Sequence, residues 1–172
     1  MKSTAGGWPA KQSPLIETLV PFRQWLFSVD KAVTEATYAA SLASVPVGCA
    51  CADCRNFEAA RDLAFPPEAL ALFAALGVDY RREGEVYAVP LAPGRHQYGG
   101  WFHFRGAILE GPDLRLTPAN NWTLPTEPLT DSFSIGFTKG YAPGIFADLH
   151  HTVQIEIETT LPWLLVDTPE PN

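Results

Sequence analysis

Alternating apolar and polar positions mark the second half of the chain. Three segments show this two-residue period, and a shorter apolar segment precedes them: residues 98–109, 132–138, 152–160 and 86–89. Side chains of a strand point alternately to the two faces of a sheet, so the pattern predicts strands with one buried face. The side chains predicted to form that buried face are Phe102, Phe104, Ile108, Phe133, Ile135, Phe137, Val153, Ile155 and Ile157.

Helical periods of three to four residues occur in the first half. The most regular helix covers residues 69–76, between the helix-start signal Pro66-Pro67 and the stop signal Gly77. Residues 31–44 and 55–63 predict two weaker amphipathic helices, the second starting at or just after Cys54. Residues 15–29 also fit a helix better than a strand, although Pro21 interrupts the run and would divide it into two short elements.

The order of these elements predicts the fold class. No convincing helix separates the last two predicted strands, so they are expected to pair antiparallel. We therefore expect an α+β fold, with N-terminal helices packed on a mainly antiparallel β-sheet from the C-terminal half. The length of 172 residues suits one core. Residues 14–167 are predicted to form this single domain, with 1–13 as a flexible leader and 168–172 as a flexible tail.

Charge and hydropathy bear on location and partners. Twelve Lys and Arg residues against nineteen Asp and Glu residues give a net charge of -7, which would repel a phosphate backbone, so no nucleic acid is expected as a partner. The longest apolar run, residues 69–76, is far below the roughly 18 residues of a membrane helix. No apolar signal segment follows Lys2. We therefore expect no membrane association and a cytoplasmic location.

The three cysteines, Cys49, Cys51 and Cys54, lie within six residues. A disulfide framework that joins distant loops cannot be built from them, so reduced thiols are expected. A turn that leads into a helix N-terminus can direct several sulfurs to one point, where the helix amides stabilise thiolate charge. Thiolates are soft ligands, so the cluster is a candidate metal site, with zinc as the candidate ion.

A structural zinc site normally has a fourth ligand, and the chain has no fourth cysteine. The candidates are water or one of the side chains of Asp53, His96, His103, His150 and His151. Two other interpretations stay open. Small cysteines can simply pack against the following helix. Cys51 to Cys54 also has the spacing of a thioredoxin-like redox motif, but Pro46 makes the upstream segment a poor central strand, so metal binding is favoured over redox chemistry.

A second candidate site, for catalysis, lies on the polar face of the predicted sheet. His103, Arg105 and Glu156 all project there if the strands alternate as proposed. In register, the imidazole and the carboxylate could form an acid–base pair, and the guanidinium could hold an anionic substrate. The same residues could equally be cross-strand charge pairs that only stabilise the sheet.

The sequence leaves three classes of function open. The first is a domain with a local, structural cysteine cluster, zinc-binding or metal-free. The second is an enzyme that uses a reactive cysteine thiolate or the His103, Arg105 and Glu156 site. The third is an interaction module that offers a sheet edge or the aromatic loop 118–128 to a protein partner or to a second copy in a homo-oligomer. The usual motifs of nucleotide-binding proteins, zincins and serine hydrolases are absent from the sequence.

Several motifs together resemble a known family. They are the C-x-C-x-x-C-R-N run from Cys49 to Asn56, the G-G-W-F-H-F strand from Gly99 to Phe104, and the segment from Ile155 to Leu165. Over about residues 45–166 the chain resembles a family of small uncharacterised bacterial proteins. The resemblance implies a bacterial cytosolic domain, and it supplies no substrate, cofactor or catalytic residue.

Overall fold

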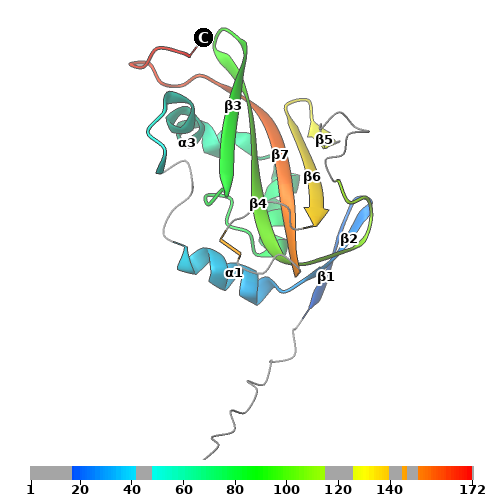
Figure 1. Cartoon of the computed structure of the whole chain (residues 1–172). Coiled ribbons are helices and arrows are strands. Elements are labelled where there is room, and N and C mark those ends of the chain that lie inside the picture. The colour runs from blue at the N-terminus through cyan, green and yellow to red at the C-terminus, as the bar shows by residue number, and fades with distance from the viewer. Residues whose placement is uncertain (1–16, 42–47, 115–125, 140–144, 147–150, 172) are drawn as a thin grey trace, which may run out of the picture.

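A computed structural model describes residues 17–41, 48–114, 126–139, 145–146 and 151–171 of the chain. The described residues form three helices and a mainly antiparallel sheet (Figure 1). The helices are α1 (Lys31–Ala40), α3 (Ala52–Ala64) and α4 (Pro67–Leu76). The strands are β1 (Thr18–Phe22), β2 (Trp25–Val29), β3 (Glu85–Ala92), β4 (Arg95–Glu110), β5 (Glu127–Thr130), β6 (Phe133–Lys139) and β7 (Thr152–Pro162). The predicted α+β class is confirmed.

The long strand β4 organises the sheet. The strand order is β1-β2-β4-β7-β6-β5, and β3 pairs with the N-terminal half of β4. On one edge β4 therefore meets β3 first and β2 later, while on its other edge it pairs with β7 over eleven positions, from Arg95 to Arg105. Strands β6 and β7 pair antiparallel, as predicted.

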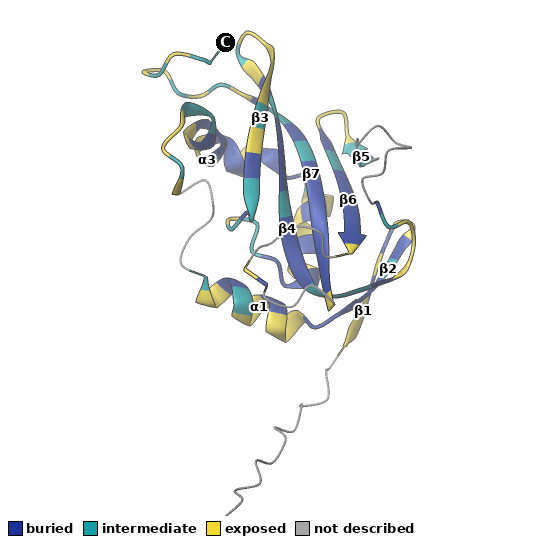
Figure 2. Cartoon of the chain, in the orientation of Figure 1, coloured by how far each residue is buried: buried dark blue, intermediate teal, exposed yellow. Residues whose placement is uncertain are grey.

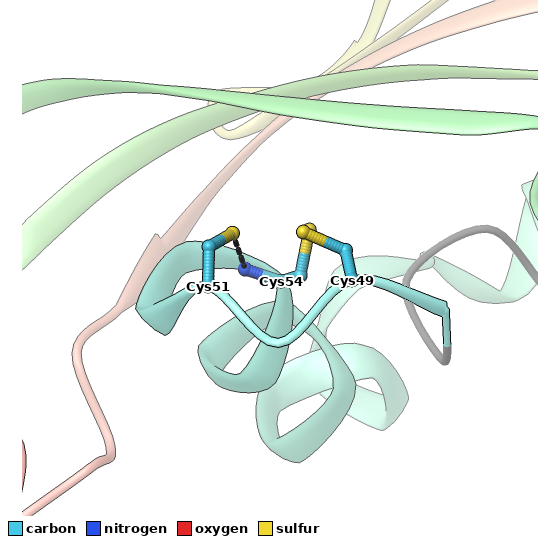
Figure 3. Close-up of side chains that lie close together, drawn as sticks. All are labelled: Cys49, Cys51 and Cys54. Carbon is cyan, nitrogen blue, oxygen red and sulfur yellow. Dashed lines mark hydrogen bonds between the residues drawn. The ribbon is translucent and has the colours of Figure 1, made fainter.

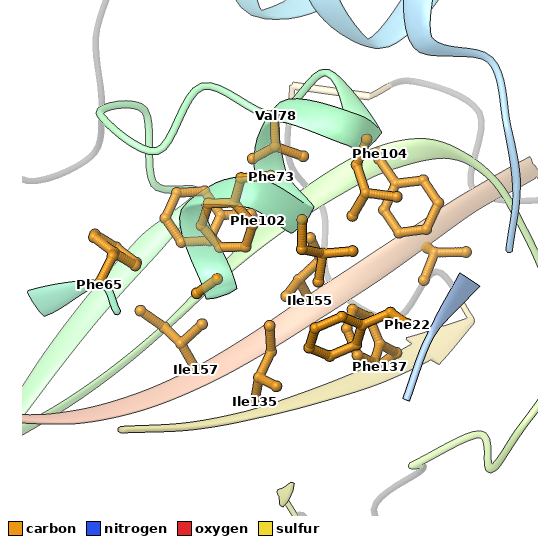
Figure 4. Packing of buried hydrophobic residues seen from close by; sticks show 14 of the residues in the cluster. Phe22, Phe65, Phe73, Val78, Phe102, Phe104, Ile135, Phe137, Ile155 and Ile157 are labelled. Atoms are coloured by element: carbon orange, nitrogen blue, oxygen red, sulfur yellow. The ribbon is translucent and has the colours of Figure 1, made fainter. Parts of the chain in front are cut away.

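The core lies on the sheet face covered by α3 and α4 (Figure 2). All nine side chains predicted to face the core are buried. Figure 4 shows the helix residue Phe73 packed against Phe102 of β4, with Phe65 beside them. The ring of Phe102 lies 4.9 Å from that of Phe73 and 5.9 Å from that of Phe65. Aromatic rings of this size account for much of the apolar surface that folding buries.

The prediction of a helix over residues 15–29 is wrong. The described part of this segment is a hairpin, β1 and β2, with Arg23 at positive φ in its turn. Pro21 fits because β1 is an edge strand, where proline is tolerated. The apolar residues of the segment belong to two strands that both pack on the core. Read along the continuous sequence, their spacing resembles the three-to-four-residue period of a helix. Phe27 of β2, for example, lies 4.7 Å from the ring of Phe137 on β6.

Other boundaries also differ from those predicted. Helix α3 begins at Ala52, three residues before the predicted range, so that Cys51 becomes its N-cap residue. Helix α1 ends at Ala40 rather than at residue 44. Strand β5 was not predicted, because its four residues include Pro128 and have no clear alternation. Helix α4 ends as predicted, since Gly77 adopts the left-handed conformation that glycine favours.

The C-terminal residues 163–171 contain no helix or strand. They nevertheless return to the sheet, where the carboxylate of Glu170 accepts hydrogen bonds from the backbone N–H of Gly94 at 2.8 and 3.0 Å. None of the helices in the described ranges has the length and apolar character needed to cross a lipid bilayer.

Candidate metal centre

The three cysteines lie at the start of α3. Cys51 caps the helix, and its Sγ accepts a hydrogen bond from the backbone N–H of Cys54 at 3.4 Å. The first backbone N–H groups of a helix have no acceptor within the helix, so a sulfur at this position supplies one. The sequence thus fixes two of the sulfurs on the first helical turn and places Cys49 two residues before the cap.

The sulfurs converge. The three Sγ atoms all lie within 4.8 Å of one another, and the three side chains leave the turn on the same side (Figure 3). Three sulfurs bound to one zinc ion at about 2.3 Å would lie about 3.8 Å apart. Small side-chain movements would therefore bring all three into the coordination sphere of one ion.

The three thiols have different surroundings. Cys54 is buried, Cys49 is half-buried and Cys51 is exposed. Hydrogen bonds from the backbone of Cys51 and from the other two thiols lower the pKa of Cys49. Burial, with the neighbouring sulfurs, raises the pKa of Cys54. Deprotonating the buried Cys54 thiol beside two other sulfurs therefore costs free energy. A bound cation would offset this cost, because it stabilises the thiolate form of all three cysteines.

No histidine or carboxylate among the described residues joins the three sulfurs in this group. Of the predicted fourth ligands, His96 is fully buried and lies between two carboxylates: its Nε2 is 2.8 Å from Oε1 of Glu170, and its Nδ1 is 3.4 Å from Oδ1 of Asp53. His103 bonds to a side chain on β7. Of the two remaining histidines, His151 is exposed and does not belong to this group, and His150 lies outside the described residues.

The predicted catalytic residues His103, Arg105 and Glu156 share the polar face of β4 and β7, but the predicted acid–base pair is not formed directly. His103 Nε2 lies 3.2 Å from Oε1 of Gln154, and Nε2 of Gln154 donates to Glu156. The register places His103 opposite Gln154 and Arg105 opposite Thr152, one pair farther from Glu156. An amide therefore bridges the imidazole and the carboxylate.

This polar network is not on an open surface. His103, Gln154 and Glu156 are each less than a tenth exposed. Burial raises the pKa of Glu156 to about 7, opposed by the hydrogen bond from Gln154 and assisted by the charge of Glu158. The carboxyl group is thus poised to exchange a proton near neutral pH, which is a property of acid–base residues and also of buried structural carboxyls.

Two residues of these clusters were missed by the sequence analysis. Gln154 carries no charge, so charge pairing gave no reason to select it, although the strand period placed it on the correct face. Glu170 lies 74 residues from His96 in sequence, in a segment without hydrophobic period. Only the path of the chain after β7 brings it there.

No family model, curated protein or solved structure matches this chain. The arrangement of the described residues is therefore the basis for the functional proposal.

Proposed function

We propose that this protein binds one zinc ion through Cys49, Cys51 and Cys54, and that the ion stabilises the first turn of α3. The observation that carries the proposal is the convergence of three thiol sulfurs within 4.8 Å at a helix N-terminus. Thiolate sulfur is a preferred ligand of zinc, and the positive end of the helix favours the negative charge that the thiolates carry.

Three protein ligands leave one position of a tetrahedral ion for water or for an external donor. Cys51 is exposed, so solvent has access to the cluster from its side. The proposed role is structural, because metal binding that orders a turn contributes its free energy to folding. The thiols are unpaired, which suits a reducing compartment such as the cytosol.

The test is elemental analysis of the full chain, purified without an affinity tag and without chelator. We expect about one equivalent of zinc in the wild type and a loss of most of it in the variants Cys49→Ser, Cys51→Ser and Cys54→Ser. His151→Ala is the matched control, since this exposed histidine lies outside the cluster. Less than about a tenth of an equivalent in folded wild-type protein, also after incubation with added zinc, would contradict the proposal.

A second candidate function is thiol chemistry at Cys49. It is favoured by the lowered pKa and the partial exposure of this thiol, beside a partner, Cys54, whose pKa is raised. The thiolate is the reactive form of cysteine, and a lowered pKa increases the fraction of thiolate at a given pH. The pH dependence of alkylation at Cys49 distinguishes this function from a purely structural cluster.

A further inference from the structure

The C-terminal residues 163–171, here called the strap, dock against the helical turn that carries the cysteines. The backbone N–H of Leu164 donates to Oδ1 of Asn56 at 2.6 Å, and the guanidinium of Arg55 donates to Thr168 Oγ1 at 3.4 Å. Asn56 and Arg55 directly follow Cys54 in α3. The strap and the thiol site thus share one short stretch of helix.

Asn56 is the central residue of this contact. It is fully buried, and its Nδ2 donates to the carbonyl of Pro162 at 3.1 Å and to the hydroxyl of Tyr98 at 2.9 Å. The bonds to Pro162 and Leu164 hold the exit of β7 against α3, and the bond to Tyr98 holds α3 against β4. A rotation of the first helical turn would break them together.

His96 forms the other side of the contact. The ring of Trp163 lies 5.0 Å from the imidazole of His96, and Nε2 of that imidazole is 2.8 Å from the Glu170 carboxylate. Its Nδ1 faces Asp53, which lies between Cys51 and Cys54 in the sequence. The strap therefore also approaches the thiol site through His96, whose Nδ1 lies 3.4 Å from Oδ1 of Asp53 without a hydrogen bond.

We propose that docking of the strap is coupled to zinc binding at Cys49, Cys51 and Cys54, so that each strengthens the other. This inference rests on the proposed function. An ion held by Cys51 and Cys54 fixes the cap and the first turn of α3. It thereby fixes the positions of Arg55 and Asn56, which bond to the strap, and of Asp53, which lies beside His96. The conformational entropy that is lost when this turn becomes ordered is then lost only once, and not separately for zinc binding and for docking of the strap.

Thermodynamic linkage makes the coupling reciprocal, so it can be measured from either side. Zinc should slow amide hydrogen exchange at Leu164 and Gly94, the two backbone groups bound to Asn56 and Glu170. Weakening the strap should lower zinc affinity by about fivefold or more, the usual lower range of such couplings.

The experiment uses the full chain and three variants. Glu170→Gln keeps the size of the side chain and removes its charge from His96, and a chain ending at Val166 lacks the Glu170 and Thr168 contacts altogether. Glu68→Gln is the matched control, because Glu68 is a carboxylate bonded to Arg23 at 2.8 Å and belongs to α4. Zinc affinity is measured by competition with a chelating indicator, and amide exchange is measured with and without zinc.

We expect at least a fivefold loss of zinc affinity in both strap variants, less than a twofold change in the control, and slower exchange at Leu164 and Gly94 when zinc is added to the wild type. Equal affinities in all four proteins, with exchange at the strap unaffected by zinc, would overturn the coupling while leaving the zinc site intact. Absence of zinc binding in the wild type would instead overturn the proposed function, and the coupling with it.

Discussion

The hydroxyl of Tyr38 bonds to both backbone polar groups of His103. It accepts from the His103 N–H at 3.1 Å and donates to the His103 carbonyl at 2.8 Å. On this edge of β4, pairing with β3 ends at Trp101 and pairing with β2 begins at Gly106. Helix α1 therefore takes the place of a strand across the gap, and Thr34 contributes in the same way by accepting from the backbone N–H of Arg105 at 3.0 Å.

We expect Tyr38→Phe to lower the free energy of unfolding by about 2–4 kcal/mol, because two buried backbone groups lose their partner and each unpaired group costs about 1–3 kcal/mol. Urea denaturation measures the change. Tyr80→Phe is the control: it also removes a hydroxyl, but one whose partner is the exposed carboxylate of Asp62 at 3.1 Å. A cost for Tyr38→Phe no larger than that of the control would show that the gap is not closed by this hydroxyl.

Glu156 should make stability depend on pH. Its pKa is raised from 4.5 to about 7, so between these values the folded protein holds a proton that the unfolded chain has released. The free energy of unfolding therefore falls as pH rises through this window, by about 3 kcal/mol at full effect, at about 1.4 kcal/mol per pKa unit.

Glu156→Gln removes this ionisable group and retains an oxygen that accepts from Gln154. We expect the variant to be more stable than the wild type at pH 8, by up to about 3 kcal/mol, and nearly equal to it at pH 5. Chemical denaturation at both values tests this, with Glu58→Gln, at an exposed position of α3, as the control. A difference between variant and wild type that does not grow with pH would show that Glu156 titrates normally.

The ion pair between Arg61 and Glu83 is another buried polar feature. Two bonds, of 2.7 and 3.1 Å, join the side chains, which are 10% and 0% exposed. Loss of one partner leaves a buried charge without compensation, so we expect Glu83→Gln to cost about 3 kcal/mol of unfolding free energy. The double variant Arg61→Met with Glu83→Gln should cost less than the sum of the two single variants. Additive costs in this double-mutant cycle, measured in urea, would show that the two charges do not stabilise one another.

The metal-free thiols should react unequally. We expect Cys49 to be alkylated before Cys54 and at lower pH, because hydrogen bonds lower the pKa of Cys49 whereas burial raises that of Cys54. Iodoacetamide labelling of chelator-treated protein across a pH series, read by peptide mass spectrometry, gives the order. If Cys49 reacts only with the ordinary pKa near 8.5, thiolate chemistry at this residue is contradicted.

The sequence by itself determined the core face and the fold class. The nine predicted core residues are buried because strand alternation is a local property that each segment shows without reference to its neighbours. The same holds for helix α4, whose end is specified by Gly77. The density of cysteines also identified the candidate metal residues, because Cys51 and Cys54 are close enough in sequence to share one helical turn.

Only the tertiary structure decided the rest. The apolar residues of β1 and β2 are distributed as in a helix, and pairing with β4 and packing against Phe137 decide for a hairpin. Gln154 enters the polar network because strand register sets it opposite His103. Glu170 lies beside His96 because the strap leaves the end of β7 next to α3 and folds back toward β4. Such contacts depend on the tertiary arrangement of segments that are distant in sequence, and a local sequence pattern contains no information about that arrangement.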